Sequence, residues 1–208
     1  MALVKLNNRG VRSASTFGSI SNLGSMILIK KQTASSSATI SFVDGTSDVV
    51  LDDTYKEYLF TFNNIHPSAN SVLSFQGNAA GGSGYNETVT CTHFQNYHEE
   101  DDGGTGFGYD TGSDLAQSTN FIPLTSGSTA INNDDCMCGE IILFNPSSTT
   151  FVKHFIAKFT NVNSTSDPNA NSSYVAGYFN TTSAIDEIQF KMSSGNIDAG
   201  DICLYGIN

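Results

Sequence analysis

The stretch Glu187-Ile-Gln-Phe-Lys-Met192 decides the fold class, because apolar and polar side chains alternate at every position. This period of two is typical of a β-strand with one buried and one exposed face. The turn-forming residues Ser193-Ser-Gly-Asn196 end the pattern, and Asp201-Ile-Cys-Leu-Tyr-Gly-Ile207 resumes it. Two such runs joined by a short turn predict a closing β-hairpin.

Comparable runs occur along most of the chain. Leu59 and Ile142 are apolar at positions whose neighbours already form the dry face, so we expect a second cover there, either another layer or a neighbouring subunit. A long acidic, glycine-rich loop is expected over 99–112. The remaining expected strands cover residues 26–31, 38–43, 55–63, 72–76, 88–96, 139–145, 151–161 and 173–179.

About ten to twelve strands at this spacing, with no convincing helix, are typical of an all-β protein. We expect an antiparallel β-sandwich of jelly-roll type. The length of 208 residues fits one such domain, over 26–208. Residues 1–25 show no sustained period and are expected to form an extended amino-terminal arm.

The charge balance narrows the range of partners. A formal net charge of −11 argues against nucleic acid and against anionic membranes. No run approaches the roughly 18 apolar residues of a membrane span, and no signal peptide is evident. The amino-terminal end is locally basic, with Lys5, Arg9 and Arg12. This arm could dock on an acidic partner or remain solvated.

The four cysteines do not form a disulfide framework. Cys136-Met-Cys138 has one intervening residue, whereas tetrahedral zinc sites usually have two and need a second pair. We therefore expect no metal or other cofactor. Cys91 and Cys203 fall inside apparent strands and are expected to be buried.

Candidate catalytic groups are sparse. His93 falls within a strand, where a hydrogen-bonded structural imidazole is expected. Glu99-Glu-Asp-Asp102 and Asp110-Thr-Gly-Ser-Asp114 could supply carboxylates for calcium or for acid–base chemistry, but solvated turns explain both runs. No Gly-x-Ser-x-Gly elbow is present. We therefore expect that the protein is not an enzyme.

Seven turn and strand-edge segments form a recognisable set: Ser41-Phe-Val-Asp-Gly45, Asp53-Thr-Tyr-Lys-Glu-Tyr58, Asn64-Ile-His-Pro67, Asn145-Pro-Ser-Ser-Thr149, Ala176-Gly-Tyr-Phe-Asn180, Ser193-Ser-Gly-Asn-Ile197 and Leu204-Tyr-Gly-Ile207. These segments resemble virion structural proteins of tailed phages, especially those that infect marine cyanobacteria. The resemblance covers most of the chain from about Met26 onward. It implies a capsid decoration protein or a neck, tail or fibre component, made in the host cytoplasm and carried on the virion.

Two hypotheses about function follow. The first is a non-enzymatic, homo-oligomeric structural protein on the virion surface, which contacts other virion proteins through its basic arm or a sheet face. The second is a tail-fibre module that binds host surface polysaccharide, with aromatic residues of the long loops stacked on sugar rings. These aromatic residues could instead plug the loops onto the core. They are Tyr85, Tyr97, Phe107 and Tyr109.

Overall fold

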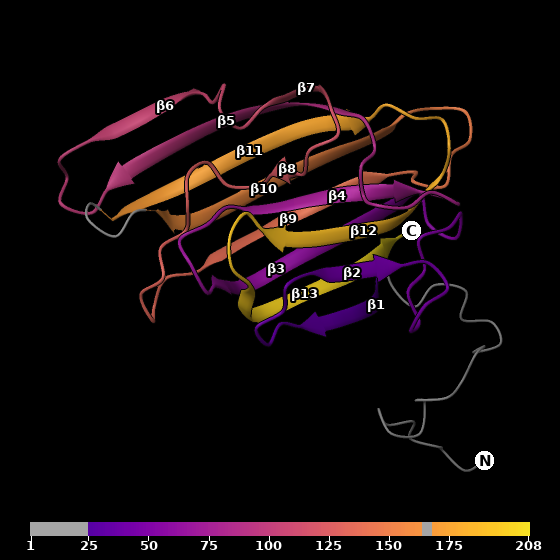
Figure 1. Ribbon diagram of the computed structural model, residues 1–208, viewed down its shortest axis with the longest axis horizontal. Coiled ribbons are helices and arrows are strands. Elements are labelled where there is room, and N and C mark those ends of the chain that lie inside the picture. Colours follow the sequence, from indigo (N-terminus) through magenta and orange to yellow (C-terminus); the bar gives the residue numbers. More distant parts are fainter. Residues whose placement is uncertain (1–24, 164–167) are drawn as a thin grey trace, which may run out of the picture.

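The computed structural model describes residues 25–163 and 168–208. In these residues the chain forms thirteen strands and no helix, and the strands make two packed antiparallel sheets (Figure 1). The expected all-β sandwich is thus confirmed. The arm residues Lys5, Arg9 and Arg12 lie outside the described residues, so the structure does not place them.

The large sheet has nine strands. The short strand β7 (Leu115–Ser118) pairs with β5 beside the main path. Along that path the order is β1 (Met26–Thr33), β13 (Ile197–Ile207), β3 (Glu57–Pro67), β9 (Met137–Phe144), β10 (Lys153–Asn163), β11 (Asn169–Phe179), β5 (Val89–Glu99) and β6 (Thr105–Tyr109).

The small sheet has four strands and packs on one face of the large sheet. Its order is β2 (Ile40–Val43), β12 (Ile185–Met192), β4 (Leu73–Ala79) and β8 (Ile122–Pro123). Figure 1 shows β2, β12 and β4 overlying the middle of the large sheet. The opposite face of the large sheet is covered by none of the described strands.

The expected closing hairpin is wrong. β12 pairs with β2 and β4 in the small sheet, whereas β13 pairs with β1 and β3 in the large one. The turn between them carries the chain from one layer to the other. This arrangement places Phe190 of β12 and Leu204 of β13 in the same core, both fully buried, where a hairpin would leave them side by side in one layer. Alternation along each strand is identical in the two cases.

Phenylalanine rings fill the space between the sheets. Phe190 of β12 contacts Phe60 and Phe62 of β3 edge to face, with ring centroids 5.4 and 5.0 Å apart. It also meets Phe42 and Phe75 at 6.2 Å. Burying one such ring contributes about 1.5–3 kcal/mol through its apolar area. The core therefore joins strands from both sheets and packs one sheet against the other.

The expected loop over 99–112 is also partly wrong, because it contains strand β6. Thr105-Gly-Phe-Gly-Tyr109 alternates glycine with larger residues, and it pairs with β5 along five positions. Gly106 lies under the Tyr97 ring, where a Cβ atom would collide with ring carbons. Because Gly106 has no side chain, the Tyr97 ring can lie over the neighbouring strand. A glycine-rich segment that is typical of a loop therefore forms an edge strand.

Candidate interaction surface

The face of the large sheet that points away from the small sheet is the candidate interaction surface, and we call it the outer face. Strand β10 shows the division clearly. Phe155, Ala157 and Phe159 are buried in the core, whereas the alternate residues His154, Ile156, Lys158 and Thr160 are exposed. A strand places successive side chains on opposite faces, so the same division holds for its neighbours.

Six apolar side chains form one straight line across the outer face, which we call the apolar row. Each residue is the direct register partner of the next, on six adjacent strands from β1 to β11. Leu28 is 54% exposed and Ile156 is 52% exposed. In order, the apolar row consists of Leu28, Tyr205, Leu59, Ile142, Ile156 and Ala176.

The second cover that Leu59 and Ile142 led us to expect is therefore absent from the described chain. Both side chains are only half-buried, through contact with their neighbours within the sheet. Residues 25–163 and 168–208 therefore leave the apolar side chains of this face uncovered.

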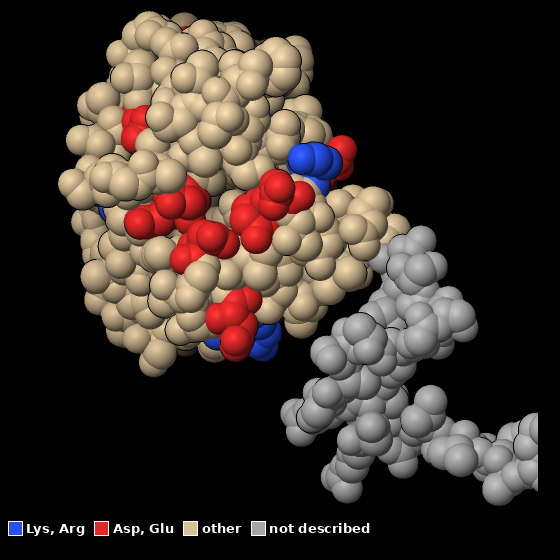
Figure 2. Space-filling model, turned by 90° about the vertical axis from the view of Figure 1, so that its right-hand side faces the viewer, with Lys and Arg blue, Asp and Glu red and all other residues tan. Residues whose placement is uncertain are grey.

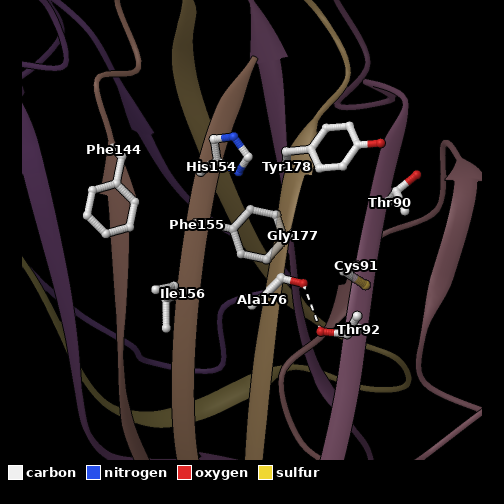
Figure 3. Close-up of a pocket in the computed structure, with 10 residues that line it drawn as sticks. All are labelled: Thr90, Cys91, Thr92, Phe144, His154, Phe155, Ile156, Ala176, Gly177 and Tyr178. Carbon is white, nitrogen blue, oxygen red and sulfur yellow. Dashed lines mark hydrogen bonds between the residues drawn. The ribbon is translucent and has the colours of Figure 1, made fainter. Parts of the chain in front are cut away.

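A shallow hollow lies at one end of the apolar row (Figure 3). Its volume is about 500 Å³, and its lining includes Phe144, His154, Ile156 and Tyr178. Figure 3 shows that these side chains come from the adjacent strands β9, β10 and β11. The rings of His154 and Tyr178 lie 5.8 Å apart between centroids. The hollow is mainly apolar and continues the surface of the apolar row.

Toward β6 the same face carries four aromatic rings, which we call the aromatic platform: Phe94, Phe107, Tyr109 and Tyr174. Phe94 stacks on Tyr174 with centroids 5.0 Å apart and planes 8° apart, and its edge meets Phe107 at 5.9 Å. Phe107 is 77% exposed and Tyr109 is 54% exposed. Lys158 of β10 lies 5.9 Å from the Tyr174 ring centroid.

The structure brings together only two of the four aromatic residues singled out from the sequence. Phe107 and Tyr109 belong to strand β6, not to a loop. Tyr97 is on β5 but faces the opposite side, over Gly106. Tyr85 lies in the β4–β5 loop, where burial raises its pKa and Ser41 and Glu187 are its neighbours.

Sequence reasoning missed Phe94 and Tyr174, the two central rings of the platform. Their register pairing across β5 and β11 joins residues 80 positions apart. Alternation within β5 does predict that Phe94 and His93 lie on opposite faces of the strand. The pairing of β5 with β11, which brings Tyr174 beside Phe94, cannot be predicted from alternation.

The aspartates considered for catalysis or calcium form local hydrogen bonds. His98 and Asp102 form an exposed pair, with Nε2 and Oδ1 3.0 Å apart. Burial opposes ionisation of Asp110, but hydrogen bonds from Ser126 Oγ at 2.6 Å and from the Gly112 N–H at 2.9 Å lower its pKa. Within the described residues, no three His, Cys, Asp or Glu side chains are placed to hold a metal ion.

No protein-family model, characterised protein or solved structure matches the chain. No helix in residues 25–163 and 168–208 is long and apolar enough to cross a membrane.

Within the part of the chain that the structure describes, His93 lacks the hydrogen bond that was expected for it. It is fully buried, as a structural residue should be, but neither ring nitrogen has a hydrogen-bond partner among the described residues. Burial lowers its pKa, so the ring is held neutral. A neutral histidine inside the core has no access to a substrate. Cys91 and Cys203 are buried, as expected.

Carboxylates gather elsewhere on the molecule. Figure 2 shows Asp and Glu side chains spread over one end, with Lys and Arg near the margins. On β12 and the end of β2, burial raises the pKa of Asp186, and the neighbouring Glu187 and Asp44 raise it further. Carboxylates are therefore plentiful at this end of the sandwich, away from the middle of the outer face.

Proposed function

We propose that this protein is a non-enzymatic structural component of a tailed-phage virion surface, and that it packs against neighbouring subunits through the outer face. The apolar row carries the proposal. Soluble monomers rarely expose a contiguous apolar patch of this kind, whereas the buried centre of an interface between identical subunits is rich in apolar surface. The sandwich in this proposal is of the jelly-roll type.

The distribution of charge supports a second copy of the chain as the neighbour. Two copies with a net charge of −11 repel each other unless they meet through a face with few carboxylates. In the middle of the outer face, Glu140 is the register partner of Lys158, so the pair is neutral as a unit. A face that carries both signs can place opposite charges against each other across a two-fold axis.

The basic residues Lys5, Arg9 and Arg12 supply the second contact of the proposal. Three positive charges within eight positions suit an acidic surface on another virion protein. The acidic end of the body would repel the same partner. The proposal therefore assigns attachment to the arm and lateral packing to the outer face.

Labelling of purified virions tests the proposed function. An antibody against the folded domain should bind intact particles of the phage that encodes the chain, and immunogold microscopy shows where. Label over the head indicates a decoration role, and label at the neck or tail indicates a component there. Absence of the chain from purified particles by mass spectrometry would refute a virion role.

Light scattering coupled to size exclusion tests the outer face directly. Ile156→Glu places a carboxylate in the apolar row, beside the hollow at its end, and it should convert the oligomer into monomers. Thr119→Glu adds the same charge at an exposed loop position outside this face, and it should leave the assembly intact. A wild-type chain that is monomeric at high concentration would contradict the packing role.

The aromatic platform favours one further candidate, a host polysaccharide as ligand. Exposed flat rings such as Phe107 and Tyr109 offer surfaces on which the apolar faces of sugar rings can stack. Assays of binding of the chain to host cells and to extracted surface glycans test whether the platform binds polysaccharide. Phe107→Ala and Tyr109→Ala should each weaken binding several-fold.

Phe151→Ala is the matched control, because Phe151 is 70% exposed but lies outside the platform. Equal binding by all three variants would exclude the platform as the sugar site.

A further inference from the structure

Two cysteine side chains converge at the start of β9, outside the surfaces described above. A turn over Asn132–Asp135 leads into the strand. The Asn132 N–H donates to Asp135 Oδ2, and the Asp135 N–H donates to the Asn132 carbonyl oxygen, both at 2.9 Å. This reciprocal pair fixes the direction in which the chain enters β9. Cys136 and Cys138 follow at once.

The neighbouring strand β3 is shaped to meet these sulfur atoms. Its register against β9 breaks between Phe62 and Ile65, and Asn64 has a left-handed backbone with a φ of 51°. The Asn64 N–H points at Cys138 Sγ, 3.3 Å away. Its side-chain Oδ1 lies 3.8 Å from Cys138 Sγ and 4.0 Å from Cys136 Sγ. One bulge therefore orients both thiols.

Both thiols are accessible. Cys136 and Cys138 are partly exposed, whereas Cys91 and Cys203 are buried. A cleft of about 510 Å³ opens beside Cys136, with Asn64, His66 and Asp134 among its lining residues. A small ion can reach these sulfur atoms from solvent.

We infer that Cys136 and Cys138 form a binding site for one soft, closed-shell monovalent metal ion of the Cu(I) and Ag(I) type. Thiolates are the ligands that such ions prefer, and two sulfur donors satisfy them. Zinc requires four ligands in a structural site, and the described residues bring no third His, Cys, Asp or Glu into such a group. The chemistry thus selects the monovalent ion.

The surrounding groups suit a metal-bound dithiolate. Both thiols lose their protons to solvent when the ion binds, so binding tightens as the pH rises. The Asn64 N–H remains free to donate to a sulfur lone pair and so holds the ligand in place.

Titration of the reduced full-length chain with Ag(I), a redox-inert ion, tests the site. Native mass spectrometry under anaerobic conditions should show one tightly held ion per chain, and thiolate-to-metal absorption in the ultraviolet should saturate at the same ratio. Cys136→Ser and Cys138→Ser should each weaken binding at least about tenfold. Zn(II) should not displace Ag(I).

Cys203→Ala is the matched control, because it removes a thiol that the site does not use. It should retain the first ion. Unchanged binding in both serine variants, or equal loss in Cys203→Ala with its fold intact by circular dichroism, would overturn the assignment. Preference for Zn(II) would also overturn it. The measurement uses the isolated chain, so its outcome is independent of where the protein lies on a virion.

Discussion

At the scale of single residues, the stability of the sandwich depends on groups that tolerate burial only in one chemical form. Tyr58 on β3 is fully buried, and its hydroxyl donates to the Asp52 carbonyl oxygen at 3.0 Å. Burial raises the pKa of Tyr58 from 10.0 to about 12. The folded chain therefore retains a proton that the unfolded chain has already lost at intermediate alkaline pH.

This difference predicts the alkaline stability profile. The contribution of the neutral Tyr58 phenol is fully present below pH 10 and is lost as the pH rises from 10 to about 12, because the unfolded state then binds fewer protons. Tyr58→Phe should flatten the fall in unfolding free energy across this window. Urea unfolding at a series of alkaline pH values measures it. Parallel profiles for the two proteins would show that another group controls the loss.

At the scale of elements, the turn between β12 and β13 determines how the sheets are connected. Gly195 has a φ of 71°, a left-handed conformation that residues with a Cβ rarely adopt. A Cβ atom there would lie 2.6 Å from Ser68 Oγ. Ser68 in turn holds the turn, because its Oγ accepts from the Asn196 N–H at 2.8 Å and its own N–H donates to the Asn196 carbonyl.

Gly195→Ala should therefore destabilise the fold by about 1–3 kcal/mol, through backbone strain and displacement of Ser68. Chemical denaturation measures the change. Gly108→Ala on β6 is the control, because Gly108 has no left-handed φ and a Cβ there would meet nothing within 4 Å. Equal destabilisation by the two variants would show that loss of glycine, rather than the geometry of the turn, is responsible.

At the scale of the whole molecule, charge and apolar surface are separated. The carboxylates of the end seen in Figure 2 repel other copies, and the apolar row attracts them. Assembly is then a balance between a short-range apolar contact and a long-range repulsion of like charges. Added salt weakens only the repulsion between like charges, because screening shortens the range of this repulsion to about 8 Å at physiological ionic strength.

Self-association should consequently tighten as salt rises. Sedimentation velocity at about 0.05 and about 0.5 M sodium chloride should show a shift toward oligomer at the higher concentration. Lys158→Glu replaces one positive charge of the outer face with a negative one, so it should weaken association most at low salt. Dissociation of the wild-type chain by added salt would instead indicate an interface held by opposite charges.

The sequence by itself determined most of the strands and which side of each of these is dry, but it missed the short strands β6, β7 and β8. Ile188 and Phe190 reveal their buried face through local alternation, and Ile142 and Leu59 reveal that a second face is also apolar. Phe107 and Tyr109 were recognised as candidate binding residues from their type alone. In each case the signal lies within a few residues of the position that it describes.

Only the tertiary structure decided which strands pair. Alternation is the same whether β12 and β13 form a hairpin or face each other across a core, so the closing turn was misassigned. The aromatic platform, the apolar row and the site at Asn64 and Cys138 all join distant segments. Their assembly depends on the free energy of packing two whole sheets around one phenylalanine core, which no local pattern contains.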